Sequence, residues 1–286
     1  LKQNRLDGLK FNSGIFTNLS QDHLDYHKNL KNYLNAKLYL FKNLIHKKGN
    51  VITDQLIPEF KNIKKITINK KLNLYSLNDK KNDLEIISHN YKGDSQSLRI
   101  KLNNKTRDIN LNLIGKIQLK NVLMSIIAAK HSNISLDKII NIISKLKPVE
   151  GRFEKIGKIK NQSNVILDYA HTPDALKTCL LNLREQFPNK KITVLFGCGG
   201  NRDQNKRAKM GKIADLYSDK IYLTDDNPRS EQPSKIRKDI KRGIKKQKVF
   251  EFTSRTRAIS KAIENLNTGE ILLVAGKGHE KTQTIG

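Results

Sequence analysis

The chain has 286 residues, which is long enough for two domains that each bury a core of their own. Its 55 Lys and Arg residues against 27 Asp and Glu residues give a formal net charge of +28, but the lysines are spread along the whole chain and no Arg-rich or aromatic-interleaved block occurs, which argues against a specific nucleic-acid partner. No apolar run approaches the roughly 20 residues of a membrane span, and two cysteines are too few for a disulfide framework, so we expect a cytoplasmic protein without a membrane span.

The first half of the chain predicts a mixture of helices and short strands. Apolar residues recur at helical spacing over residues 30–45, and residues 118–131 and 135–146 predict two further helices, the second with Ser135 as its N-cap. Between them, short β-like runs alternate with polar turns, at residues 51–53, 65–68, 84–87 and 98–100. A proline ends the last of these helices, so we place a domain boundary near Pro148.

The second half of the chain alternates strand and helix. The expected strands are 164–168, 191–196, 220–224, 249–252 and 270–275, and the expected helices are 173–186, 205–217, 233–245 and 255–265. Such alternation is typical of a parallel sheet covered by helices on both faces. The sequence therefore predicts an α/β protein whose second domain, residues 149–286, is Rossmann-like.

The segment Asp225-Asp226-Asn227-Pro228-Arg229 follows directly after one of these strands. Ligands of open α/β sheets bind at that edge. Pro228 fixes a rigid turn, the amide of Asn227 both donates and accepts, and Arg229 carries a planar fork suited to a carboxylate. The loop therefore indicates a site for a small zwitterion, although an ordinary strand-to-helix turn explains the loop alone equally well.

Two more strand ends carry glycines followed by charged residues. One is Gly197-Cys198-Gly199-Gly200-Asn201-Arg202, where the glycines allow close backbone approach and Arg202 can clamp a carboxylate or phosphate. The other is Gly276-Lys277-Gly278-His279-Glu280, where Glu280 can receive an ammonium group. With the preceding loop, these segments would present two carboxylate clamps and one ammonium acceptor. A glycine-rich loop by itself can also be only a tight turn.

A fourth strand end, Asp168 to Asp174, opens a helix with Thr172 as N-cap and Pro173 at its first position. A helix N-terminus stabilises an anion, and His171 beside it could contact a phosphate or a reacting group. A plain loop histidine is the alternative.

The first half contains a polar loop and an unusually placed lysine. Residues 17–27 hold two His and two Asp residues, a set that suits a divalent cation, although a solvated polar loop is also consistent with it. Lys37 falls between Leu34 and Phe41 on an apolar helical stripe, where an ammonium group is costly. Either its methylenes alone are buried, or the amine is converted to a carbamate, an anion able to bind Mg²⁺.

Taken together, these segments closely resemble the Mur ligase family over essentially the whole chain. The matching segments are 17–27, 33–37, 151–154, 168–174, 197–203 and 276–280. In this family Asp-Asn-Pro-Arg marks members that add meso-diaminopimelate, whereas lysine-adding members carry another residue in place of the Arg. Asn201 stands where the family usually has Asp, and Ala208 where it usually has Pro.

The resemblance implies an ATP-dependent amide ligation. The γ-carboxylate of D-Glu in UDP-N-acetylmuramoyl-L-alanyl-D-glutamate would become an acyl phosphate, which the amino group of meso-diaminopimelate attacks. The implied roles are His23 and carbamylated Lys37 for Mg²⁺; Arg152, Asp168 and His171 for ATP; His23, Lys37 and His171 for catalysis; and Arg202, Asp226, Asn227, Pro228, Arg229, Gly276 and Glu280 for diaminopimelate.

One family feature is absent from the sequence. No Gly-x-x-x-x-Gly-Lys-Ser/Thr loop occurs, yet the family binds the ATP phosphates through such a loop. We therefore expect residues 1–148 to be the second half of a central ATP-binding domain, with the loop upstream, and the isolated chain to be an inactive monomer. The alternatives are a ligase for another amino acid or dipeptide, a folylpolyglutamate-type ligase, and a basic nucleic-acid-binding protein.

Overall fold

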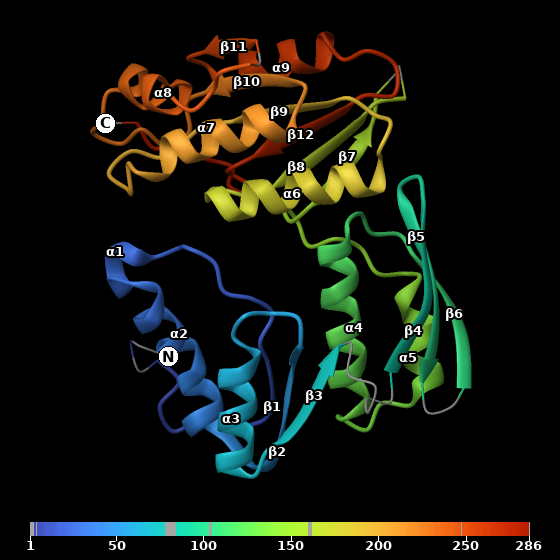
Figure 1. Ribbon diagram of the computed structural model, residues 1–286. Coiled ribbons are helices and arrows are strands. Elements are labelled where there is room, and N and C mark those ends of the chain that lie inside the picture. The colour runs from blue at the N-terminus through green and yellow to red at the C-terminus, as the bar shows by residue number, and fades with distance from the viewer. Residues whose placement is uncertain are drawn as a thin grey trace. The chain divides into compact units, whose positions relative to one another are not determined.

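The computed structural model describes residues 3, 5–77, 84–102, 105–159, 162–246 and 248–285. The chain divides into two compact units, Leu1–Lys147 and Pro148–Gly286 (Figure 1). Within the described ranges, no helix is long and apolar enough to cross a membrane.

The first unit begins with a parallel sheet of order β1-β2-β3. Its elements are β1 (Phe11–Ile15), α1 (Leu24–His27), α2 (Leu30–Tyr39), the π-helical turn η1 (Leu40–Leu44), β2 (Ile45–Asp54), α3 (Phe60–Lys70) and β3 (Asn73–Leu77). Neighbouring residues of β2 point to opposite faces of the sheet. Val51 packs in the cluster formed with α2, η1 and α3, whereas Ile52 belongs to the cluster on the other side.

That other cluster joins the sheet to an antiparallel meander of β4 (Leu84–Lys92), β5 (Ser95–Leu102) and β6 (Lys105–Leu111), and to helices α4 (Lys116–Lys130) and α5 (Leu136–Ile143). The helix predicted from residue 118 is confirmed as α4. The helix predicted over residues 135–146 is confirmed as α5, which is shorter and has Ser135 at its N-cap position.

One strand predicted for the first unit is wrong, and one observed strand was not predicted. The β-like run at 65–68 is wrong, because those residues lie within α3. Ile63, Ile66 and Thr67 are buried at helical spacing, so packing of one helical face overrides the strand preference of β-branched side chains. Strand β3 directly after α3 was not predicted.

The second unit is a sheet of order β11-β10-β9-β12-β8-β7. Its strands are β7 (Glu154–Lys158), β8 (Asn164–Asp168), β9 (Ile192–Phe196), β10 (Lys220–Thr224), β11 (Val249–Phe252) and β12 (Ile271–Ala275), alternating with helices α6 (Pro173–Gln186), α7 (Lys206–Tyr217), α8 (Pro233–Lys241) and α9 (Arg255–Glu264). The predicted strands and helices are confirmed to within a few residues. The antiparallel edge strand β7 was not predicted.

Helices cover both faces of this sheet (Figure 1). Helix α9 packs on one face through Ala258 and Ala262, which join Leu195, Tyr222 and Leu272 in one core cluster. Helices α6 and α7 lie on the opposite face. Strands β8, β9, β10 and β12 are neighbours and run parallel, so their carboxyl ends meet at one edge.

Candidate active site

Three loops meet at that edge: the glycine loop (residues 197–203), the Asn-Pro-Arg loop (225–231) and the Gly-Lys-Gly loop (276–280). The first two lie directly against each other. A Cβ on Gly197 would stand 2.2 Å from Thr224 O, and one on Gly200 would stand 1.9 Å from Pro228 O. Only glycine allows backbones to approach so closely, which explains the composition of the first loop.

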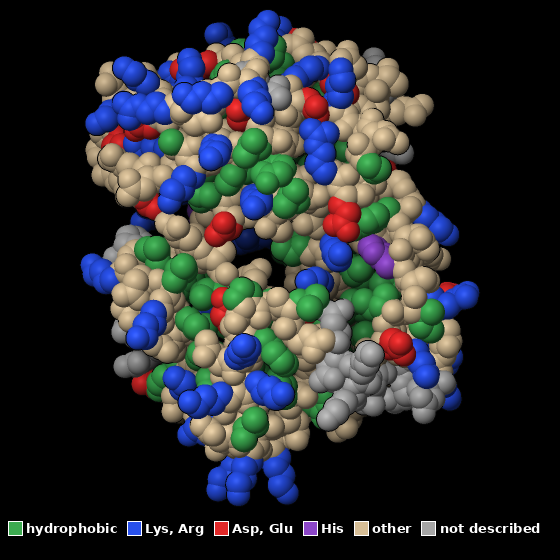
Figure 2. Space-filling view, in the orientation of Figure 1, with side chains coloured by type: hydrophobic (Ala, Val, Ile, Leu, Met, Phe, Trp, Pro, Cys, Tyr) green, Lys and Arg blue, Asp and Glu red, His purple; other side chains and the backbone are tan. Residues whose placement is uncertain are grey.

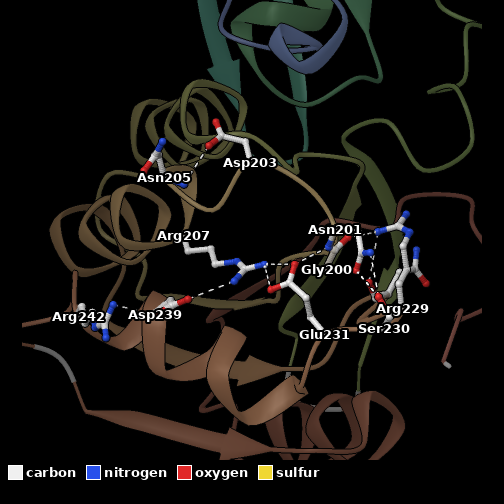
Figure 3. Close-up of polar contacts among 11 residues, drawn as sticks. Gly200, Asn201, Asp203, Asn205, Arg207, Arg229, Ser230, Glu231, Asp239 and Arg242 are labelled. Atoms are coloured by element: carbon white, nitrogen blue, oxygen red, sulfur yellow. Dashed lines mark hydrogen bonds and ion pairs between the residues drawn. The ribbon is translucent and has the colours of Figure 1, made fainter.

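The guanidinium of Arg229 is held between these two loops (Figure 3). Its Nη1 donates to Gly200 O at 2.7 Å and to Asn227 O at 3.4 Å, while Gly200 N donates to Asn227 O at 2.9 Å. Around Gly199, a Cβ would lie 3.0 Å from Arg229 Nη1 and 3.9 Å from Arg202 Cγ. The structure therefore brings together the two arginines that the sequence proposed as carboxylate clamps, with Arg202 exposed on the glycine loop.

Asn227 connects the Asn-Pro-Arg loop to the Gly-Lys-Gly loop. Its Oδ1 accepts from Lys277 Nζ and from the backbone N–H of Thr284, both at 2.9 Å, and its Nδ2 donates to Glu280 Oε2 at 3.2 Å. Because an ammonium and a backbone N–H only donate, the amide orientation is fixed. Asn227 therefore presents its Nδ2 as the donor for an incoming oxygen.

The carboxylate of Glu280 already has an ammonium partner. Lys277 Nζ lies 3.2 Å from Glu280 Oε2, and Tyr169 Oη donates to Glu280 Oε1 at 3.0 Å. Burial raises the pKa of Glu280, but the hydrogen bonds from Tyr169 and Lys277 lower it by more. The pKa of Glu280 therefore lies below its usual value. Sequence reasoning missed Lys277, although it stands in the same motif.

Asp226 and Gly276 lie next to each other at this edge. Asp226 is 8 % exposed, and its Oδ1 accepts the N–H of Asn227 at 2.7 Å. Gly276 has a φ of 111°, its N donates to Asp168 O at 3.1 Å, and a Cβ there would stand 3.0 Å from Asp226 Oδ2. Both residues thus shape the loops, and Pro228 contributes the carbonyl that faces Gly200.

Asp168 organises the end of β8. Its Oδ2 accepts Phe153 N and its Oδ1 accepts Ala170 N, both at 2.7 Å, and Cys179 Sγ lies 3.3 Å from Oδ1. Burial raises the pKa of Asp168 despite these hydrogen bonds. Its carboxylate oxygens therefore accept hydrogen bonds from backbone N–H groups around them.

Arg152 and His171 flank the ring of Tyr169. The guanidinium of Arg152 lies 4.6 Å from the ring centroid, and the His171 ring packs edge-on at 4.9 Å. His171 Nδ1 lies 2.9 Å from Tyr169 O. A carbonyl only accepts, so Nδ1 carries the proton and Nε2 is the acceptor in the neutral ring. The predicted helix cap is confirmed, since Thr172 Oγ1 accepts from Ala175 N.

Another cation at this edge, Arg255, was not singled out from the sequence. Its Nη2 donates to Ala275 O at 2.8 Å, and its Nη1 is buried without a hydrogen-bond partner among the described residues. Burial lowers the pKa of Arg255, while the charges of Asp226 and Glu280 act in the opposite direction. This edge of the sheet therefore carries Arg255 in addition to Arg202 and Arg229.

The first unit gathers its proposed site residues around Tyr33. Lys37 Nζ lies 5.0 Å from the Tyr33 ring centroid and 5.8 Å from that of Phe16, and donates to Asn18 O at 3.2 Å. The exposed His23 packs edge-on against Tyr33 at 6.1 Å. The structure thus brings His23 and Lys37 to the same aromatic side chain.

The structure places two of the candidate ligands in this loop, His23 and Asp22, within ion-pair distance of each other. His23 Nε2 lies 3.5 Å from Asp22 Oδ2, whereas His27 stacks on Tyr33 at 4.7 Å, and the side chain of Asp25 lies outside the described residues. In the described part of the chain, no group of three or more His, Cys, Asp or Glu side chains could hold a metal ion. Burial lowers the pKa of Lys37, although Asp22 and Glu59 oppose this, so its amine is neutral more often than a free lysine.

Comparison with known proteins places these features in a family. The model of the Mur ligase middle domain matches residues 1–129, and the model of the Mur ligase glutamate ligase domain matches residues 151–278. A protein of Rickettsia montanensis named UDP-N-acetylmuramoyl-L-alanyl-D-glutamate--2,6-diaminopimelate ligase is 41% identical over 287 residues, covering 100% of this chain and 59% of that protein. A protein of the same name from Leptospira interrogans is 37% identical, covering 100% of this chain and 58% of its own length.

Solved structures agree with this assignment. A structure of a protein of that same name aligns with a TM-score of 0.64 at 31% identity, covering 99% of this chain and 58% of the other. The MurF ligase of Thermotoga maritima in complex with ADP aligns with a TM-score of 0.70 at 18% identity, covering 93% and 58%, and so shares the fold. The chain thus spans less than two thirds of the length of these relatives, and it belongs to the Mur ligase family.

Proposed function

We propose that this chain forms part of an ATP-dependent ligase that joins meso-diaminopimelate to UDP-N-acetylmuramoyl-L-alanyl-D-glutamate in peptidoglycan precursor synthesis. The observation that carries the proposal is the clamp in which Arg229 Nη1 bonds Gly200 O while Arg202 lies beside it. Relatives that match the whole chain bear the name of this ligase. ATP and UDP-linked precursors are cytoplasmic metabolites, so the proposal includes a cytoplasmic location.

The residues of the edge suit an amino acid with two carboxylates. Arg229 and Arg202 offer planar forks that bind carboxylates in bidentate fashion. Asn227 supplies an amide donor whose orientation is already fixed by Lys277. Glu280 is the acceptor for an ammonium group, which would share the carboxylate with Lys277 or replace it. L-lysine lacks the second carboxylate and would leave one arginine unmatched.

The fit of Mg²⁺ depends on Lys37. His23 and Asp22 give only two donors, and a carbamate on Lys37 would supply the further oxygen that a magnesium site needs. A neutral amine is required to form that carbamate, and the burial that lowers the pKa of Lys37 favours one. When bound, Mg²⁺ would neutralise negative charge that develops during phosphoryl transfer.

The residues near Tyr169 suit the nucleotide. Arg152 is the cation there, and His171 stands directly before a helix N-terminus whose backbone N–H groups favour an anion. When its ring is neutral, His171 presents Nε2 as an acceptor. The carboxylate of Asp168 would act indirectly, by holding the N–H groups of Phe153 and Ala170 in place.

The test is incorporation of the amino acid by a complete protein that contains these 286 residues. We expect meso-diaminopimelate to be used in strong preference to L-lysine, by about 2–4 kcal/mol, because lysine leaves the partly buried Arg229 without a carboxylate partner. Arg229→Ala should raise the KM for diaminopimelate sharply and leave the KM for ATP nearly unchanged. Equal use of the two amino acids by the unmodified protein would refute the proposal.

The face shown in Figure 2 does not favour the alternative of a basic nucleic-acid-binding protein. On the face shown in Figure 2, Lys and Arg side chains are scattered among Asp and Glu and do not gather in one stripe. Specific nucleic-acid recognition uses such a stripe or patch. A ligase that adds a dipeptide with a single carboxylate would lack a use for the second arginine at the clamp.

A further inference from the structure

Arg207 is a buried cation that the proposed chemistry does not use. It lies on the first turn of α7, its side chain is 0% exposed, and it is among the largest fully buried side chains of the described residues. Its Nη2 donates to both carboxylate oxygens of Glu231 at 2.9 Å, and its Nη1 donates to Asp239 Oδ2 at 3.1 Å (Figure 3). Its Nε has no hydrogen-bond partner within the described part of the chain.

This arrangement is costly if stability is its only purpose. Removing a guanidinium from water carries a large desolvation penalty, and apolar side chains of similar volume are often at least as stabilising as a buried ion pair. The unpaired Nε adds to that penalty. The groups that Arg207 holds in place indicate another role.

Glu231 links Arg207 to the glycine loop. Its Oε1 also accepts the backbone N–H of Asn201, and the Asn201 amide and Ser230 hydroxyl contact each other at 2.9 and 3.0 Å. Burial raises the pKa of Glu231, but hydrogen bonds from Arg207 and Asn201 lower it below its usual value. The link is thus an ionised carboxylate that ties two loops together.

Arg229 lies in the turn that leads to Glu231. Glu231 N donates to Pro228 O at 3.1 Å, closing a turn with Arg229 at its centre. Arg229 has a φ of 52°, a left-handed conformation that is unfavourable for a side chain without special support. The Asn-Pro-Arg loop therefore meets the glycine loop at two places. One is Gly200, which bonds Arg229 and Asn227, and the other is Asn201, which bonds Glu231 and Ser230.

We infer that Arg207 is a positioning residue that sets the place of Arg229 through Glu231, and thereby the selectivity for the amino-acid substrate. Without Arg207, Glu231 keeps its carboxylate but loses the cation that orients it, so the second meeting point loosens. Arg229 would then explore positions in which its fork no longer faces a carboxylate. The selectivity part of this inference rests on the proposed function; the positioning part does not.

The experiment uses Arg207→Met, which keeps volume, and Glu231→Gln, which keeps shape but removes the charge. Arg207→Lys keeps the positive charge but can form fewer hydrogen bonds. Arg184→Met is the matched control, because Arg184 pairs with Asp219 at the opposite ends of the strands, with Nη2 2.6 Å from Oδ2. Hydrogen–deuterium exchange of the 286-residue chain reports on residues 199–201 and 227–231.

We expect faster exchange in both segments in Arg207→Met and Glu231→Gln, a smaller change in Arg207→Lys, and no change there in Arg184→Met. If Arg207→Met does not fold, Glu231→Gln carries the same comparison. Unchanged exchange in the folded variants would overturn the inference, whatever the protein catalyses.

In a complete protein that contains the chain, Arg207→Met should raise the KM for meso-diaminopimelate by about 10- to 100-fold, the effect of misplacing a binding group by about 1 Å. The KM for ATP should stay within about twofold, since a general loss of folded protein lowers the rate without changing either KM. Equal changes in both KM values would overturn the selectivity part. Absence of ligation by the unmodified protein would instead refute the proposed function, and the exchange result would still decide the positioning.

Discussion

Substitution of Gly200 by alanine tests the packing that holds Arg229. The added Cβ would stand 1.9 Å from Pro228 O, a backbone atom that cannot rotate away, whereas real Cβ atoms essentially never come closer than 3.0 Å. The two loops must therefore separate by about 1 Å. A shift of this size breaks the bonds of 2.7 Å from Arg229 Nη1 to Gly200 O and of 2.9 Å from Gly200 N to Asn227 O.

The magnitude follows from these losses. Two hydrogen bonds contribute about 1 kcal/mol each. Strain from overpacking costs about 1–3 kcal/mol. The lower entropy of the unfolded chain returns about 0.4–1 kcal/mol. We expect Gly200→Ala to lower the free energy of unfolding of the second unit by about 2–4 kcal/mol.

The assay uses the cysteines of the chain as reporters. Cys179 and Cys198 are free, buried and both in the second unit, so thiol labelling in urea follows the unfolding of that unit. Gly157→Ala on β7 is the control, because a Cβ there meets no atom within 4 Å. The reasoning is refuted if Gly200→Ala and Gly157→Ala expose the thiols at the same urea concentration.

Three further predictions concern single groups. Asp168→Ala leaves two backbone N–H groups without their acceptor and should destabilise the second unit by about 2–5 kcal/mol in the same assay; an unchanged midpoint would contradict this. Lys37 should take up ¹³C-labelled bicarbonate as a carbamate detectable by NMR, and Lys37→Ala should lose that signal. Absence of the signal in the chain that retains Lys37 would disprove the carbamate. Burial raises the pKa of Cys198 to about 12, so its reactive thiolate becomes abundant only as pH approaches that value. In folded protein at pH 8, Cys198 should therefore react far more slowly than a free thiol, and equal rates would show that it is not buried.

The elements of the second unit were predictable because their signals are local. Strands β8 and β10 and helix α6 have the bounds expected from the sequence, since short β-branched runs end at loops and Thr172-Pro173 starts the helix. The motifs at the strand ends indicated a site because parallel neighbours bring their carboxyl ends together. Resemblance to a family added the roles, which local chemistry alone left open.

Other features depend on contacts between residues far apart in the sequence. The run at 65–68 forms a helix because Ile63 and Ile66 meet a core supplied by η1 and β2. Strand β7 pairs in antiparallel fashion with β8, and its own short sequence does not reveal such an edge position. Long-range packing thus overrode or completed the local preference in both places.

The sequence by itself determined the α/β class and the types of side chain at the strand ends, because periodicity, caps and turn residues act over a few neighbours. Only the tertiary structure decided how those side chains are paired. It placed Lys277 against Glu280, oriented the amide of Asn227, and joined Arg207 to Glu231, which is 24 residues away along the chain. Hydrogen-bond partners of buried charges are chosen by the whole fold, since burial without a partner is what makes a charge costly.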